Sequence, residues 1–355
     1  MMKGKERESN IELLRILAMC MIISMHYWSN SGAFESLLFR HNPADVGNAV
    51  LFHLSESMCI GGVNLFVLIT GFFSVRQQTI YWRKIMRLLV DVAFWGLVGL
   101  LLGSALGWTS LDPRSLVRVA IPYLWNNRWF VESYLILLLL IPFINLCLRQ
   151  LRRSGHQMLL AVAVGLFVLW PSFLPNPPID DFGYGFVHFI TLYLTAAYIR
   201  LYVTKYPPAS VCLLVAALAT ALIFAGAAYG FMVSWAYNFV LVLVQSVSLF
   251  LFFGQLSIRS SVINTLAGYS FGIFLIHSDS SFFAPFVYNR IFQASATIHG
   301  QAWVLALNLT VCVVAFYLFC VVLEHGKRWL FRYSVDKWID RQKWLEPWEI
   351  KEARA

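Results

Sequence analysis

Residues 15–26 read RILAMCMIISMH, so an apolar run is closed at one end by an arginine and at the other by a histidine. The run lies within a longer apolar segment, residues 11–28, which follows a short cationic head at residues 3–7. Such a head resembles that of a secretory signal, but the segment contains Arg15 and has no convincing small-residue cleavage site. We therefore predict that the segment is retained as a first membrane span.

The composition of the whole chain supports the same interpretation. Of its 355 residues 59% are hydrophobic and 16% aromatic, whereas only 13% are charged. A soluble domain needs more charge than this to cover its surface. The sequence therefore predicts a polytopic membrane protein.

Runs of roughly 20 apolar residues, the length needed to cross a hydrocarbon core of about 30 Å, recur along the chain. Ten candidate spans lie near residues 11–28, 56–75, 86–106, 130–148, 157–174, 185–203, 210–230, 233–253, 262–283 and 302–324. We predict an all-α integral membrane protein of about ten transmembrane helices with no fused soluble domain. Its transmembrane domain is expected over residues 8–325, and residues 326–355 are expected to form a basic amphipathic tail on the cytoplasmic lipid surface.

The positions of Lys and Arg predict the orientation, because cytoplasmic segments retain positive charge. With the N-terminus inside, 21 of the 27 Lys and Arg residues fall on the inside, Arg15 lies within the first span and five fall on the outside. The five outside are Arg40, Arg114, Arg118, Arg128 and Arg290. This asymmetry predicts that both termini are cytoplasmic.

Several classes of function are disfavoured. The six cysteines are scattered, with no CxxC pair and no Cys/His ligand spacing, so neither a disulfide framework nor a metal site is indicated. The net charge of +9 comes without a contiguous basic tract interleaved with aromatic residues, so membrane topology explains it better than nucleic-acid binding does.

The two ionisable residues of the first span project from nearly the same helix face. Eleven steps of about 100° bring His26 to about 20° past three full turns from Arg15, and about 1.5 Å per residue separates them by roughly 16 Å along the axis. Such residues often mark a polar pathway inside a bundle. In the alternative interpretation Arg15 snorkels to the inner headgroups and His26 sits at the outer interface beside aromatic residues.

Other spans bring polar groups to the level of His26. In the run NTLAGYSFGIFLIHSD, residues 264–279, His277 lies about fifteen residues from the inner end of its span. From the outer side, residues 126–135 read NNRWFVESYL and add Asn126, Asn127 and Glu132. Glu132 could orient a histidine. Alternatively, it forms an i, i+4 pair with Arg128.

A basic cluster opens the third span at its inner end. The segment YWRKIMRLLV, residues 81–90, contains Arg83, Lys84 and Arg87, whose i, i+3 and i, i+4 spacings could grip a diphosphate. As an alternative, the cluster only marks the cytoplasmic side of the membrane.

Taken together, these motifs resemble the bacterial acyltransferase 3 family, integral-membrane enzymes that O-acylate cell-surface glycans. The signature of the family's first helix, Arg or Lys followed by ten residues and His, matches Arg15 and His26. The Phe-rich Ser-Gly-Phe segment appears as VNLFVLITGFFSV, residues 63–75, with Thr70 in place of the common Ser. The motif of two basic residues separated by two others falls on Lys84 and Arg87, where lysine lacks the bidentate fork of arginine.

Two further motifs complete the resemblance. The Trp-Phe-Leu start of the fourth span appears as Trp129–Val131, and the aromatic-Gly-Ile-aromatic-Leu-Ile-His segment appears as SFGIFLIH, residues 270–277. The resemblance covers the first four predicted spans and the ninth, and its scaffold extends over about residues 8–325.

The resemblance implies the substrates and the roles of these residues. The donor is an acyl-CoA, most often acetyl-CoA, with no permanently bound cofactor, and the acceptor is a hydroxyl of a glycan or lipid-linked sugar. The localisation it implies is the bacterial cytoplasmic membrane. Arg15, Arg83, Lys84 and Arg87 are the candidates for donor binding. The candidates for catalysis are His26, Arg15, Glu132 and His277, and those for acceptor binding are Asn126, Asn127 and Trp129.

A polytopic transporter or flippase is the competing class of function. Intramembrane Arg, His and Glu would suit a substrate or proton path equally well, and such a protein would show internal repeats or paired broken helices.

Overall fold

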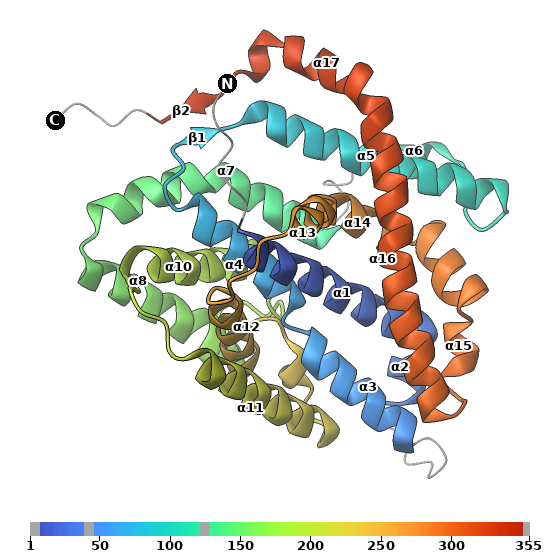
Figure 1. Ribbon diagram of the computed structural model, residues 1–355, viewed down its shortest axis with the longest axis horizontal. Helices are drawn as coiled ribbons and strands as arrows, with labels where there is room; N and C mark the ends of the chain where they lie inside the picture. The colour runs from blue at the N-terminus through green and yellow to red at the C-terminus, as the bar shows by residue number, and fades with distance from the viewer. Residues whose placement is uncertain (1–7, 39–45, 121–127, 351–355) are drawn as a thin grey trace.

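The computed structural model describes residues 8–38, 46–120 and 128–350, and over these ranges the chain is almost entirely helical (Figure 1). The first half contains α1 (Ser9–Ser31), α2 (Ala33–Ser36), α3 (Val46–Cys59), α4 (Gly62–Ser74), α5 (Trp82–Ala105), α6 (Pro113–Ala120), α7 (Trp129–Gln150), α8 (Arg153–Val164), the π-helix η3 (Gly165–Leu169) and α9 (Trp170–Phe173). The second half contains α10 (Phe186–Tyr202), α11 (Ala209–Ala228), η4 (Met232–Trp235), α12 (Val240–Phe253), α13 (Ser261–Ala267), α14 (Ser270–His277), η5 (Pro285–Ile291), α15 (Ala294–Thr297), α16 (Ala302–Tyr333), α17 (Val335–Arg341) and η6 (Lys343–Leu345).

Eight helical segments in the described part of the chain are long and apolar enough to cross a membrane. They are residues 9–31, 46–74, 82–105, 129–150, 153–173, 209–228, 232–253 and 302–333. The prediction of an all-α membrane protein agrees with this architecture, although two of the ten predicted spans differ from it. The span predicted at 185–203 is α10, a shorter apolar helix of 17 residues. The span predicted at 262–283 is divided into α13 and α14, and its helix ends at His277.

Helix α1 is the central element of the bundle. It contacts α3, α4, α13, α14 and α16 (Figure 1). Cross-helix hydrogen bonds hold it. Among them, Tyr27 Oη donates to Asn308 Oδ1 on α16 at 2.8 Å, Trp28 Nε1 donates to Ser55 Oγ on α3 at 2.9 Å, and Tyr288 Oη donates to the carbonyl of Ile23 at 3.1 Å. Such bonds satisfy polar groups that lipid could not. The first span is therefore fixed in rotation as well as in position.

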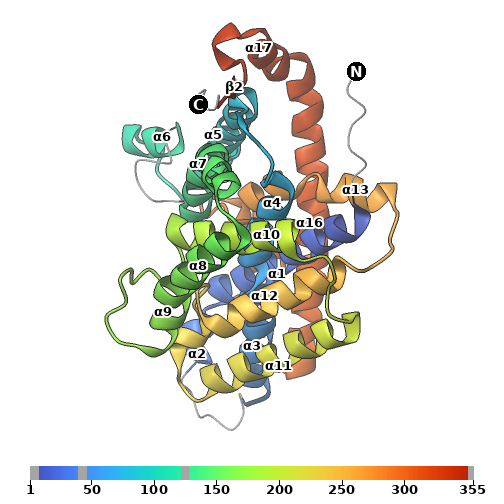
Figure 2. The ribbon, with the colours of Figure 1, turned by 90° about the vertical axis from the view of Figure 1, so that its left-hand side faces the viewer.

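Around this centre the other helices form an outer layer. Helices α11 and α12 pack against each other, and α4 packs on α10. Helix α6 packs on α5 at the edge of the molecule (Figure 2). All six cysteines carry free thiols.

A buried charged cluster ties α5 to α16. Glu324 accepts hydrogen bonds from Lys327 Nζ at 2.8 Å, Arg328 Nε at 2.9 Å and Trp95 Nε1 at 2.9 Å. Lys327 also pairs with Asp91 at 2.7 Å. Charges inside a bundle need such partners, because leaving one unpaired costs several kcal/mol.

The C-terminal segment packs back onto the start of α5. Strand β2 (Trp348–Glu349) pairs antiparallel with β1 (Thr79–Ile80) just before α5, and α17 lies beside α5 at the top of Figure 1. Helix α16 continues to Tyr333, beyond the predicted end of the last span. The residues predicted to lie on the lipid surface thus make defined contacts with the rest of the protein.

Candidate functional site

A cavity of about 320 Å³ lies among α1, α4, α5, α7, α13 and α14. We call it the inner cavity, because it contains residues of the predicted cytoplasmic ends of α1 and α5. Its polar lining residues are Arg15, Thr70, Ser74, Lys84, Tyr134 and Ser270. Because the cavity also has many aromatic and aliphatic neighbours, it suits an elongated ligand with few polar groups and a charged end.

Arg15 lines the inner cavity together with Met19 and Ile22, which follow it at helical spacing. Its Nη1 lies 3.3 Å from Glu12 Oε2 one turn earlier, and its side chain is 26% exposed. The guanidinium therefore belongs to the wall of a cavity, as the pathway interpretation requires, and Lys84 adds a second cation to the same wall.

His26 and His277 lie against each other. Their ring centroids are 4.8 Å apart and their planes are inclined by 34°. One ring comes from α1 and the other from the last residue of α14, so the predicted common level of the two histidines corresponds to a direct contact.

His277 is held in a defined orientation. Its Nδ1 hydrogen bonds the carbonyl of Ile273 at 2.7 Å, so Nδ1 carries the proton and Nε2 is left as an acceptor. The side chain is buried, and Nε2 has no hydrogen-bond partner among the described residues. A buried nitrogen of this kind is available to a neighbouring imidazole or to a substrate proton.

Two phenylalanines stand between this histidine pair and the inner cavity. Phe130 and Phe274 both line the cavity, and their ring centroids are 4.8 Å apart. The centroid of the Phe274 ring is also 5.8 Å from that of His277. Neither histidine lines the cavity itself. His26 continues the face of Arg15, Met19 and Ile22 one turn beyond the last of these lining residues.

The predicted basic cluster does not converge on one point. Lys84 lines the inner cavity, but Arg87 donates to Asp336 at 3.0 Å and to Asp340 at 2.7 Å on α17. Arg83 Nε is buried without a hydrogen-bond partner among the described residues. The three cations of the predicted cluster thus have different surroundings in the structure, because α17 supplies the carboxylates that hold Arg87.

The residues predicted at the outer end are separated as well. The backbone N–H of Glu132 donates to the carbonyl of Arg128 at 3.1 Å, and over the described ranges its Oε1 is buried without a hydrogen-bond partner. Arg128 instead lies 3.8 Å from the carboxylate of Asp279. The residues Asn126 and Asn127 lie outside the described ranges.

Trp129, the third residue predicted for the acceptor, packs against two tyrosines. The ring centroids of Tyr184 and Tyr237 are 4.5 Å and 5.3 Å from it.

Sequence reasoning missed several buried polar residues. Glu56 on α3 is 2% exposed, and its Oε1 has no hydrogen-bond partner among the described residues. His188 on α10 is also buried and lies 3.1 Å from Asn64 Oδ1. Glu56 is the first residue of the span predicted at residues 56–75. An acidic residue flanked on both sides by apolar runs was the available signal.

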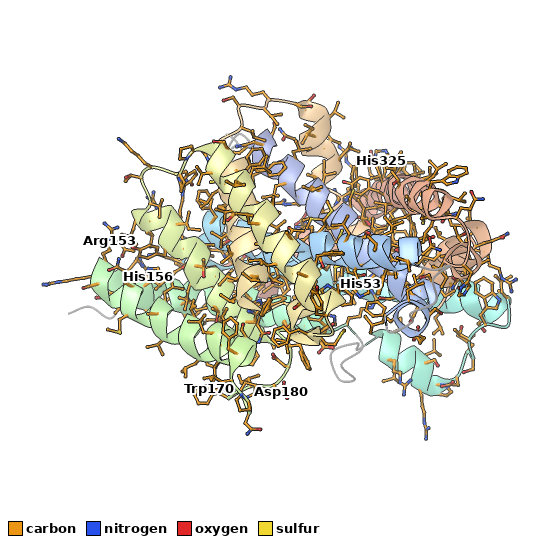
Figure 3. All side chains as sticks on the ribbon, turned by 90° about the horizontal axis from the view of Figure 1, so that it is seen from below. His53, Arg153, His156, Trp170, Asp180 and His325 are labelled. Atoms are coloured by element: carbon orange, nitrogen blue, oxygen red, sulfur yellow. The ribbon has the colours of Figure 1, made fainter. Side chains whose placement is uncertain are left out.

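Other histidines do not extend the site. His53, His156 and His325 lie on α3, α8 and α16, well apart in Figure 3. Over the described ranges no group of three or more His, Cys, Asp or Glu residues is placed to hold a metal ion.

Comparison with known proteins gives one family. A family model described as an acyltransferase domain, of the acyltransferase 3 type, matches residues 8–325. Neither the curated proteins nor the solved structures give a match to the chain.

Proposed function

The chain belongs to the acyltransferase 3 family and is a membrane acyltransferase, and we propose that it transfers an acetyl group from cytoplasmic acetyl-CoA to a hydroxyl of a cell-surface or lipid-linked glycan. The observation that carries this proposal is the row Arg15, Met19, Ile22 and His26 on α1. It begins in a cavity with two cations and ends at a histidine pair.

The size of the inner cavity fits part of the donor. At about 320 Å³ it lies at the small end of ligand pockets, which span about 300–1,000 Å³. A pantetheine arm with its acetyl group fits such a space, and the nucleotide stays at the mouth. There Lys84 and Arg15 supply positive charge for the phosphates. The axial distance of roughly 16 Å from Arg15 to His26 matches the length of an extended arm.

In the reaction His26 acts as general base. It takes the proton of the acceptor hydroxyl while that oxygen forms a bond to the thioester carbonyl carbon. The tetrahedral intermediate then collapses as the carbon–sulfur bond breaks. The proton held by His26 passes to the departing sulfur, so the products are the acetyl ester and free CoA thiol.

His277 is the positioning residue for that base. With Nδ1 bound to Ile273, its Nε2 is an acceptor, and its ring lies against that of His26. An N–H of His26 bound to this acceptor fixes the tautomer of His26 and leaves its other nitrogen free to take the proton. The hydroxyls of Thr70 and Tyr134, 3.3 Å apart on the cavity wall, are polar groups that the thioester passes.

The experiment that tests the proposal uses purified protein in nanodiscs with acetyl-CoA labelled in the acetyl group. General-base catalysis contributes about 10²–10⁴-fold, so His26→Ala should lower thiol release at least a hundredfold. His299→Ala provides a matched control, because His299 is an exposed histidine outside the inner cavity. It should retain the wild-type rate. Full thiol release by monodisperse His26→Ala protein would refute the role of His26.

A further inference from the structure

A second cavity, of about 470 Å³, lies further along α5 and beyond the end of α14. We call it the outer cavity. It is lined by parts of α5 and α6, by Arg128 at the start of α7 and by residues 278–281, which follow α14. It shares no lining residue with the inner cavity.

The two cavities lie along continuous rows of helix positions. On α5 the inner cavity takes Lys84 and Leu88, and the outer cavity takes Val92, Gly96 and Leu100, each four residues further on. Neighbouring members of this row are about 40° apart around the helix, so the row winds gradually along α5 from one cavity to the other.

Helix α14 shows the same continuity and places the histidine pair between the cavities. Phe274 lines the inner cavity and Ser278 lines the outer one. The step of four residues from one position to the other corresponds to about 6 Å of rise. His277 lies between them and contacts His26. An acceptor in the outer cavity would therefore approach the pair from the side opposite the donor.

The outer cavity is rich in hydroxyl groups. They come from Thr109, Ser110, Ser115, Ser278, Ser280 and Ser281. Hydroxyls that donate and accept at many angles suit a polyhydroxylated ligand.

The charged residues of the outer cavity differ in whether a group of opposite charge lies beside them. Asp279 is buried, accepts from the backbone N–H of Phe282 at 2.9 Å and lies 3.8 Å from Arg128. Gly99 on α5 makes room for the Asp279 carboxylate, which a Cβ at that position would meet. Arg118 on α6 is exposed to the cavity and has no ion pair among the described residues. The wall thus has an excess positive charge at Arg118.

We propose that the outer cavity binds the acceptor, and that the acceptor is a sugar bearing an anionic substituent, a carboxylate or a phosphate. The sugar hydroxyls meet the Ser and Thr hydroxyls of the wall, and the anion meets the guanidinium of Arg118. This inference rests on the proposed acyl transfer, because it places the acceptor on the far side of the histidine pair from the donor.

The test supplies labelled acetyl-CoA to the protein in nanodiscs, with the glycan fraction of the source cells separated by anion exchange into acidic and neutral pools. Label should enter the acidic pool. Arg118→Gln should raise KM for the acidic pool about tenfold, as expected for a lost charge-assisted contact, and change kcat far less. Arg114→Gln, an exposed arginine of the same helix outside the cavity, is the matched control and should leave KM within twofold.

A second pair of variants tests the cavity rather than the charge. Ser280→Trp places a large ring at the exposed rim of the outer cavity and should lower transfer at least tenfold, whereas Ser295→Trp, exposed and outside it, should not. Label found only in the neutral pool, equal KM values for Arg118→Gln and Arg114→Gln, or full transfer by Ser280→Trp would each overturn the inference. Acetyl-CoA consumed by water alone, with no label in either pool, would overturn the inference and leave the donor reaction standing. Absence of any consumption by the wild-type protein would overturn the proposed function itself.

Discussion

Replacement of Glu324 by glutamine tests how α5 and α16 are held together. The Glu324 side chain is 1% exposed and that of Lys327 is 3% exposed. Glu324→Gln keeps the shape but removes the charge that balances Lys327. Breaking a buried ion pair from one side costs about 3–5 kcal/mol. Because Asp91 still contacts Lys327 at 2.7 Å, we expect the lower end, about 3 kcal/mol.

Arg87→Gln is the control for this variant. It breaks two ion pairs to α17, but the side chain of Arg87 is 40% exposed and those of Asp336 and Asp340 are 36% and 54% exposed. Exposed pairs contribute about 1 kcal/mol or less. The midpoint of thermal unfolding in detergent, followed by tryptophan fluorescence, should fall several times further for Glu324→Gln than for Arg87→Gln. Equal shifts would show that the cluster between α5 and α16 stabilises the fold no more than a surface contact does.

Three further predictions concern the path from Arg15 to the histidine pair. Arg15→Ala should raise KM for acetyl-CoA about tenfold or more, whereas Arg76→Ala, outside the inner cavity, should leave it within twofold; unchanged donor affinity would assign Arg15 to the membrane surface. His277→Phe keeps a ring but removes the acceptor nitrogen, so kcat should fall about 10²-fold with little change in KM, as measured by thiol release. The rate would stay at the wild-type value if His277 served only as packing. Phe274→Ala opens the barrier between the inner cavity and the pair, so propionyl- and butyryl-CoA should be used more readily relative to acetyl-CoA, and an unchanged preference would argue against a barrier at this ring.

Much of the candidate site could be predicted from the spacing of residues along single helices and from the family motifs. The eleven-residue spacing of Arg15 and His26 fixes a common face, and the family motif at residues 270–277 marks a second histidine. Their contact at 4.8 Å could not be derived, because it depends on where α14 ends and how it packs on α1. Likewise, three nearby cations on α5 suggested one phosphate site. Two carboxylates about 250 residues later in the chain divide that cluster, and no local pattern carries this information.

The interruption of the ninth predicted span is another feature that local sequence patterns do not predict. Hydropathy reads residues 262–283 as one continuous run, because it measures polarity and not backbone direction. The structure ends α13 at Ala267 and starts α14 at Ser270, and residues 278–281 then turn to line the outer cavity. This turn places Ser278, Ser280 and Ser281 in the wall of the outer cavity, and the mean hydropathy of the segment does not indicate it.

The length of α16 has a consequence for how a large polar donor reaches the enzyme. At about 1.5 Å per residue its 32 residues extend about 48 Å, well beyond a hydrocarbon core of about 30 Å. Because the apolar part of α16 comes first in its sequence, its C-terminal turns project on the predicted inner side, and α17 follows them there. The proposed donor site beside Lys84 belongs to this end of the bundle, so we expect a soluble nucleotide to reach it from the aqueous phase.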